Sequence, residues 1–409
     1  MNQSIITSTF TLPNGLRVVH VPGKGAVTYC GLAINAGSRD EDPDKWGLAH
    51  FVEHTIFKGT THRRSWHIIN RMETVGGELN AYTTKEGTML YSIFPGEHLN
   101  RATELIADLV INSVFPEAEL EREREVVMDE ADSYRDTPSE AIYDDFEDLF
   151  FAGSQLGHNI LGTEEHLRRI TSAHCRAYLD NLYVPLNMVF FVYGNHPFDA
   201  VMRLAERHFG AMTHPTRRTE RIVPPVVEPF RKVIAIDSHQ SHTLMGARLF
   251  GLDDERRYAM ALLNNILGGP GMNSLLNVQM RERRGMVYTV ESNMSLLTDC
   301  GMLQIYFGCD AHHVEPSLRI IERTLTQLAS SPISQRQLDA AKKQYKGQLL
   351  VASDSSEAIA LSAAKSMLYR GYVVPSKETI EHIDALTPQH LLDAAALIAP
   401  ERCSVLTMQ

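Results

Sequence analysis

The segment from Gly47 to Phe57 carries two histidines and a glutamate in an otherwise apolar stretch. The pattern predicts a helix, on which His50 and His54 lie one turn apart and face the same side. Two imidazoles at this spacing supply two of the ligands that a tetrahedral zinc site needs. Glu53 is offset from them, so its carboxylate is free to reach a water molecule at such a metal and act as a general base.

The order H-x-x-E-H is the inverse of the commoner H-E-x-x-H and is typical of inverzincin peptidases. The motif is short, and a chain with 18 histidines can contain it by chance. A pair of hydrogen-bonded histidines on a half-buried helix is the alternative. The motif alone leaves both interpretations open.

A catalytic zinc site takes a third protein ligand and keeps one position for water. The glutamate-rich stretch 120–130 offers candidates, because Glu123 and Glu130 are two helical turns apart and share a face with apolar residues. A solvated charged helix is the alternative, but it explains less well a carboxylate that follows three apolar residues. The residue types by themselves do not decide between the two.

Five segments resemble the pitrilysin family of zinc peptidases, which includes insulin-degrading enzyme and mitochondrial processing peptidase. Together they cover both halves of the chain, in the order found in the family. The segments are HFVEH at 50–54, GGELNAYT at 76–83, EREVVMDE at 123–130, LGTE at 161–164 and RERRGMVY at 281–288. Met286 and Val287 replace the Leu and Ala that are usual in the family, and they leave the residues discussed below untouched.

The resemblance implies that His50, His54 and Glu130 bind Zn2+, one ion per chain, and that Glu53 is the general base. Glu123 is expected to support the metal ligands from a second shell of contacts. Zinc lowers the pKa of its bound water toward neutrality and polarises a peptide carbonyl. The chain is therefore expected to be a zinc metalloendopeptidase that acts on short or unfolded peptides.

The resemblance also implies substrate contacts in both halves of the chain. Asn80 and Ala81 lie in the family's substrate-binding edge strand, where an extended peptide can bind as an added strand. Arg281 and Tyr288 are expected to contact the substrate and the transition state. As residue types alone, they would be read as a surface salt bridge and a core aromatic.

The elements that must position these residues are of the α+β type. The patterns predict a fold of two similar domains related by duplication, each a mostly antiparallel sheet packed with helices. In the first half, strands are expected within 8–12, 16–21, 29–36, 79–94 and 188–193, and helices within 47–59, 65–75, 99–114, 117–134, 172–182 and up to 209.

Composition suggests a domain boundary in the Pro-rich stretch 213–229, which we expect to be a linker. Residues 1–212 are then the zinc-binding catalytic domain, and 230–409 are a second homologous domain that carries Arg281 and Tyr288. This second domain is expected to hold no metal, because Leu263 and Asn264 occupy the positions that correspond to Glu53 and His54.

The composition excludes several classes of protein. With 39 Lys+Arg against 50 Asp+Glu the formal net charge is −11, which disfavours nucleic acid or an anionic membrane as a partner. Five cysteines without a C-x-x-C pair indicate reduced thiols and neither a disulfide framework nor a thiolate metal site. We expect a cytoplasmic location, since no signal peptide and no membrane-spanning apolar run is found.

The resemblance implies an enclosed chamber formed by two halves, of which this chain has the length of one. The expected assembly is a homodimer in which the partner's second domain completes each active site. Two alternatives stay open. One is a non-catalytic pitrilysin-like scaffold, and the other is a subunit that is active only with a different partner chain.

Overall fold

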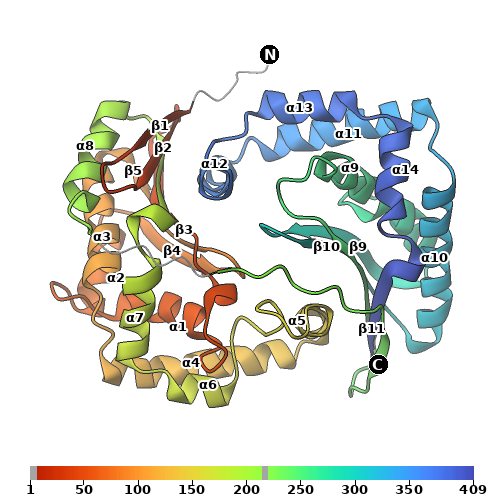
Figure 1. Cartoon of the computed structure of the whole chain (residues 1–409), viewed down its shortest axis with the longest axis horizontal. Coiled ribbons are helices and arrows are strands. Elements are labelled where there is room, and N and C mark those ends of the chain that lie inside the picture. Colours follow the sequence, from red (N-terminus) through yellow and green to blue (C-terminus); the bar gives the residue numbers. More distant parts are fainter. Residues whose placement is uncertain (1–6, 214–219) are drawn as a thin grey trace. The chain divides into compact units, whose positions relative to one another are not determined.

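A computed structural model describes residues 7–213 and 220–409 (Figure 1). Residues 214–219, which belong to the predicted linker 213–229, lie outside the described residues. The chain divides into two compact units. Unit 1 comprises residues 1–132, 158–222 and 352–376, and unit 2 comprises residues 133–157, 223–351 and 377–409.

These units differ from the contiguous ranges 1–212 and 230–409 that the sequence predicts. Each unit takes one helix from the other half of the chain. Helix α5 (Pro138–Phe150) belongs to unit 2, and helix α12 (Ser356–Arg370) belongs to unit 1. The physical reason is that each sheet has two apolar faces, and its own half of the chain covers only one of them.

The sheet of unit 1 has six strands, of which only β2 and β6 pair in parallel, and β4 forms one edge. Their spatial order is β1 (Ser8–Thr11), β2 (Arg17–Pro22), β6 (Met188–Gly194), β3 (Val27–Ile34), β5 (Thr88–Pro95) and β4 (Glu78–Thr83).

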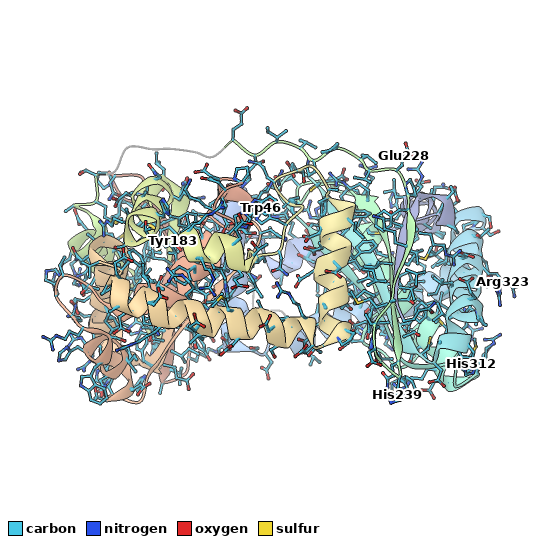
Figure 2. All side chains as sticks on the ribbon, turned by 90° about the horizontal axis from the view of Figure 1, so that it is seen from below. Trp46, Tyr183, Glu228, His239, His312 and Arg323 are labelled. Atoms are coloured by element: carbon cyan, nitrogen blue, oxygen red, sulfur yellow. The ribbon has the colours of Figure 1, made fainter. Side chains whose placement is uncertain are left out.

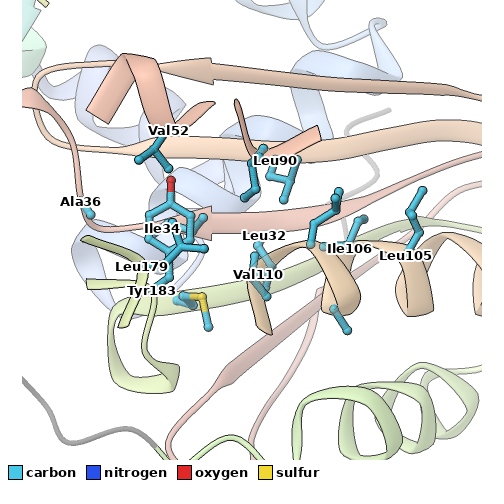
Figure 3. Packing of buried hydrophobic residues seen from close by; sticks show 14 of the residues in the cluster. Leu32, Ile34, Ala36, Val52, Leu90, Leu105, Ile106, Val110, Leu179 and Tyr183 are labelled. Atoms are coloured by element: carbon cyan, nitrogen blue, oxygen red, sulfur yellow. The ribbon is translucent and has the colours of Figure 1, made fainter. Parts of the chain in front are cut away.

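One face of this sheet packs against the helices that carry the site. Alternation along the strands sends Leu32 and Phe190 into this core. Figure 3 shows Val110 of one covering helix beside Leu32 of β3. Besides α5, the helices of the first half are α1 (Leu48–Thr55), α2 (Ser65–Glu73), α3 (Leu99–Asn112), α4 (Glu117–Arg135), α6 (Glu164–Arg169), α7 (Ser172–Leu182) and α8 (Phe198–Phe209).

The opposite face of the same sheet is covered by α12. Ala33 and Phe191, the strand neighbours of the residues above, pack there against Ala360 and Ala364. At the end of α12, the Arg17 guanidinium donates a hydrogen bond of 2.8 Å to the Met367 carbonyl. The small side chains of α12 allow close packing on the strands, which explains why this helix belongs to unit 1.

The sheet of unit 2 repeats this arrangement with five strands. Their spatial order is β7 (Arg231–Ile234), β11 (Cys403–Met408), β8 (Ser241–Leu249), β10 (Gly301–Cys309) and β9 (Val287–Leu296). One face packs against helices from the same half, namely α9 (Arg257–Gly268), α10 (Val314–Ser330), α11 (Gln335–Ala352) and α14 (Pro388–Ala396). This half also contains α13 (Ser376–Ala385). The other face packs against Ile142, Phe146 and Phe150 of α5.

The two sheets have equivalent topologies. The order β2-β6-β3-β5-β4 in unit 1 corresponds to β7-β11-β8-β10-β9 in unit 2, and each contains a single parallel pair, β2 with β6 and β7 with β11. Helices α7 and α14 also begin with the same capping box, Thr171 with His174 and Thr387 with His390. The predicted fold class of two similar, mostly antiparallel α+β domains is confirmed.

The predicted strands and helices of the first half are all observed, with ends that differ by a few residues. Helices α5 and α6 were not anticipated. All five cysteines are buried and none forms a disulfide, as expected. Within the described ranges, no helix is both long enough and apolar enough to cross a bilayer.

The packing of α5 leads to a prediction about stability. Phe146 is fully buried against the sheet of unit 2. Phe146→Ala should lower the free energy of unfolding by about 3–5 kcal/mol, because it removes apolar contacts and leaves a cavity. Urea unfolding followed by circular dichroism measures the change. Val126→Ala, at a half-exposed position of α4, is the control and should cost about 0.5 kcal/mol or less. Equal losses in the two variants would contradict the assignment of α5 to this core.

Candidate active site

Helix α1, which carries the H-x-x-E-H motif, begins at a glycine that no other residue can replace without strain. Gly47 has a φ of 91°, in the left-handed region. A Cβ at Gly47 would lie 2.6 Å from the carbonyl oxygen of Leu161, which belongs to the L-G-T-E segment. The close contact of these two backbone segments fixes where α1 starts.

A buried carboxylate caps the same helix. Glu41 accepts hydrogen bonds from the backbone N–H of Gly47 at 3.0 Å and of Ala49 at 2.6 Å. Burial raises the pKa of Glu41 to about 8. His158 Nε2 lies 3.3 Å from the Glu41 carboxylate, and its ring stacks on Trp46 at 4.8 Å (Trp46 is labelled in Figure 2). The N-terminal turn of α1 is therefore held by side chains from two other segments.

His50, His54 and Glu130 converge on one point in unit 1. One ligand atom from each residue lies within 4.8 Å of the other two. Glu130 Oε2 is 3.8 Å from His50 Nε2 and 3.4 Å from His54 Nε2, and the two imidazole rings are 4.5 Å apart between centroids. Glu130 comes from α4, so the group joins two helices that are far apart in the sequence.

Glu123 lies behind His54, also on α4. Its Oε1 is 3.1 Å from His54 Nδ1, and its Oε2 is 2.6 Å from Lys58 Nζ. A proton held on Nδ1 by this carboxylate would leave the lone pair of His54 Nε2 for a metal ion. Although burial raises the pKa of Glu123, the hydrogen bonds from His54 and Lys58 outweigh it and lower the pKa overall.

The environment of His50 favours a neutral imidazole. Burial, together with the nearby charge of His54, lowers the pKa of His50 to about 3. Burial acts in the same direction on His54, but the bond to Glu123 and the charge of Glu53 outweigh it and raise the pKa of His54. The Nδ1 atom of His50 is buried without a hydrogen-bond partner among the described residues.

Glu53 lies beside His50, His54 and Glu130 but is not one of these three candidate metal ligands. Burial raises the pKa of Glu53, and a hydrogen bond from Thr83 opposes this rise. The Thr83 hydroxyl donates to Glu53 Oε2 at 3.0 Å. Thr83 is the last residue of β4, so this bond connects the proposed base to the edge strand.

Asn80 and Ala81 lie in β4 at the edge of the sheet, where they pair with Tyr91 and Leu90 of β5. Both side chains are half-buried. Because β4 pairs on one side only within the described sheet, its outward backbone groups are available to an added strand.

Arg281 and Tyr288 belong to unit 2, whereas the metal-binding candidates belong to unit 1. Arg281 is exposed on the helical turn Asn277–Glu282. Tyr288 is in β9 with 55% of its surface exposed, and its hydroxyl donates a hydrogen bond of 2.8 Å to Asp310 Oδ1. This hydrogen bond raises the pKa of Tyr288.

The donor set in unit 1 fits zinc. Two imidazoles and one carboxylate with room for a further ligand are the donors of a catalytic zinc site, and His50 is held neutral as a ligand must be. When bound, zinc would supply Lewis acidity toward a water molecule and a peptide carbonyl.

Two family models match the chain. "Insulinase (Peptidase family M16)" matches residues 18–164, and "Peptidase M16 inactive domain" matches residues 169–345. An uncharacterized zinc protease of Bacillus subtilis is 32% identical over 379 residues, which is 92% of each chain. The chain belongs to peptidase family M16. The predicted resemblance to the pitrilysin family is thereby confirmed.

A further relative and two solved structures are also similar to this chain. An uncharacterized zinc protease of Streptomyces coelicolor is 31% identical over 409 residues, covering 97% of this chain and 88% of the relative. A protease from Helicobacter pylori has the same fold, with a TM-score of 0.90 at 21% identity over 99% of this chain and 100% of that one. A peptidase M16 inactive domain from Pseudomonas fluorescens has a TM-score of 0.92 at 19% identity, over 99% and 98% of the two chains.

Several residues around the site of this M16 chain were not anticipated from the sequence. Glu41 caps the helix of the motif, and Thr83 donates a hydrogen bond to Glu53. Lys58 forms an ion pair with Glu123, and His158 lies beside Glu41. Thr83 is part of the quoted G-G-E-L-N-A-Y-T segment, so its position offered a signal. The other three are isolated in sequence, and no local pattern distinguishes them.

The pair of Glu123 with His54 leads to a prediction about metal affinity. Glu123→Gln should lower zinc affinity by about 10–100-fold, because the imidazole loses the partner that sets its orientation and proton position. Competition with a zinc-binding dye measures this. Glu125→Gln, an exposed position on the same helix, is the matched control. Wild-type affinity in the Glu123 variant would contradict the supporting role.

The capping carboxylate Glu41 leads to a prediction about pH. Its pKa is raised from 4.5 to about 8 in the folded chain, so the folded state retains a proton that the unfolded state releases. The stability contributed by this proton is complete below pH 4.5 and is lost as pH rises to about 8. Urea unfolding of the wild type and Glu41→Gln across this range should show the wild type losing stability relative to the variant. Parallel pH profiles would contradict the buried, protonated state of Glu41.

Proposed function

We propose that this chain is a zinc metalloendopeptidase that hydrolyses short or unfolded peptides, with Glu53 as the general base. The observation that carries the proposal is the convergence of His50, His54 and Glu130 beside Glu53 in a member of family M16. The chain is an enzyme of the zinc peptidase class, in agreement with its family and the names of its relatives. One zinc ion per chain, held by the three converging residues, is the proposed cofactor.

Glu53 is the residue proposed to move the proton. It takes a proton from the attacking water and returns it to the nitrogen of the departing amine, so that no net proton is gained or lost by the enzyme. A raised pKa brings the carboxyl group nearer to the working pH, which favours both transfers. The Thr83 hydroxyl orients one oxygen of Glu53 and leaves the other oxygen for the water.

The edge strand β4 is proposed to bind the substrate backbone. A peptide added beside Asn80 and Ala81 is extended and makes main-chain hydrogen bonds, so recognition depends little on its sequence. Such a strand must be free of competing structure in the substrate. Short or unfolded peptides meet this condition, and folded proteins do not.

We also propose that Arg281 and Tyr288 contact the substrate and the transition state from the second domain, residues 230–409, which has no counterpart of the H-x-x-E-H motif. In this proposal two chains form a homodimer around an enclosed chamber, and each active site is completed by the partner's second domain. A protein donor such as the Tyr288 hydroxyl would stabilise the developing oxyanion. A cytoplasmic location remains a prediction.

The first test is cleavage of an internally quenched, unstructured peptide by the purified full-length chain. Glu53→Gln should reduce kcat by about 10²–10⁴-fold and leave the zinc content unchanged, because it removes the base and none of the ligands. Glu73→Gln, an exposed position on α2, is the control. Equal cleavage by Glu53→Gln and wild type would refute the assigned base. No cleavage by zinc-loaded wild type would favour the scaffold or the subunit that needs a different partner.

The second test concerns the shared active site. Glu53→Gln and Tyr288→Phe chains are each expected to be inactive as homodimers. When they are co-expressed, half of the random dimers are mixed and each has one intact site, so roughly a quarter of wild-type activity should return. Activity assays on the purified mixture measure this. A complete absence of recovery would count against completion of the site by the partner.

A further inference from the structure

A second group of metal-binding side chains lies in unit 2. Asp310, His312 and His313 each offer a ligand atom within 4.8 Å of those of the other two. They occupy the turn between β10, which ends at Cys309, and α10, which begins at Val314. The sequence pattern D-x-H-H is too short to have singled them out.

The turn brings the two imidazoles together. The backbone N–H of His313 donates to the carbonyl of Asp310 at 2.8 Å, which closes a single helical turn. The rings of His312 and His313 are 3.9 Å apart between centroids. His312 is exposed, and Figure 2 places it near the start of α10 at the surface, while His313 and Asp310 are half-buried. A hydrated cation can therefore reach the group from solvent.

Asp310 is held in place by a neighbouring strand. The hydroxyl of Tyr288 donates to Asp310 Oδ1 at 2.8 Å, and β9 and β10 pair directly, with Val287 opposite Cys309. A carboxylate that accepts a hydrogen bond on one oxygen keeps lone pairs on the other for a metal ion. Hydrogen-bonded carboxylate ligands of this kind are usual in protein metal sites.

The donor chemistry selects the class of ion. Two imidazoles and one carboxylate suit Zn2+, Cu2+ or Ni2+, whereas Mg2+ and Ca2+ prefer sites made of oxygen atoms. We propose that Asp310, His312 and His313 form a second site for a divalent transition metal, separate from the His50–His54–Glu130 group and weaker because its ligands are more exposed. With the second site filled, one chain binds two zinc ions.

An occupied second site would affect Tyr288. Metal binding fixes Asp310, and the Tyr288 hydroxyl then stays on Asp310 Oδ1. A donor held on Asp310 is withdrawn from a peptide carbonyl. This consequence rests on the proposed role of Tyr288 in substrate contact, and it predicts that zinc in excess of one ion per chain slows peptide cleavage.

Equilibrium dialysis of the full-length chain against zinc tests the site without any activity assay. Wild type should bind two zinc ions with separable affinities, and the double variant His312→Ala, His313→Ala should lose the weaker one. His54→Ala should lose the tighter ion and retain the weaker one. His67→Ala, an exposed histidine on α2, should bind two ions like wild type. Because His312 is exposed, His312→Gln provides a second variant in which folding is not at risk, and it should also weaken the second ion.

Binding of a single zinc ion by wild type would overturn the proposal. Retention of the weaker ion by the double variant, or its loss in His67→Ala, would also overturn it. These outcomes are independent of catalysis, so they are informative even if the chain cleaves no peptide. If the chain is active, excess zinc should slow wild type and not the double variant. Equal inhibition of the two would refute the link from the second site to Tyr288.

Discussion

The approach of two imidazoles to the carboxylate of Glu130 is the constraint on which the rest of the site depends. His50 and His54 must share one face of α1, and Glu130 must reach that face from α4, 3.4–3.8 Å away. A displacement of either helix by a fraction of its diameter would separate these atoms. Three features therefore fix α1 and α4 relative to each other. They are the left-handed Gly47, the cap from Glu41 and the packing of α4 in the core.

In the proposed function, the same contacts connect metal binding with proton transfer and substrate binding. Helix α4 supplies both Glu130 and Glu123, so the carboxylate that faces the imidazoles and the one that orients His54 move as one body. Strand β4 supplies Thr83 to Glu53, and in the proposed function its outer edge binds an extended peptide. In this arrangement a peptide bound along β4 lies on the element that also orients the proposed base, which lowers the entropy cost of bringing the reacting groups together.

Periodicity in the sequence was sufficient to predict α1 and the shared face of Glu123 and Glu130, and the similarity of segments in the two halves predicted the duplicated α+β fold. It could not show that α5 and α12 cover the sheet formed by the other half, because an amphipathic pattern marks a buried face without naming its partner. The sequence also did not predict the roles of Glu41, Lys58 and His158. Their contacts join segments that are far apart in the sequence or that carry no recognisable motif. The Asp310 turn became visible only when its three side chains were placed in space.

The central claim is that a single metal ion, held by His50, His54 and Glu130, makes this chain a peptidase. The most direct measurement is to remove the metal with a chelator, return zinc in known amounts, and follow cleavage of an unstructured peptide together with bound zinc. Cleavage should be absent without zinc and should rise in proportion to the zinc added, up to one ion per chain. Cleavage that persists in the metal-free chain, or that is still absent when one ion is bound, would contradict the claim.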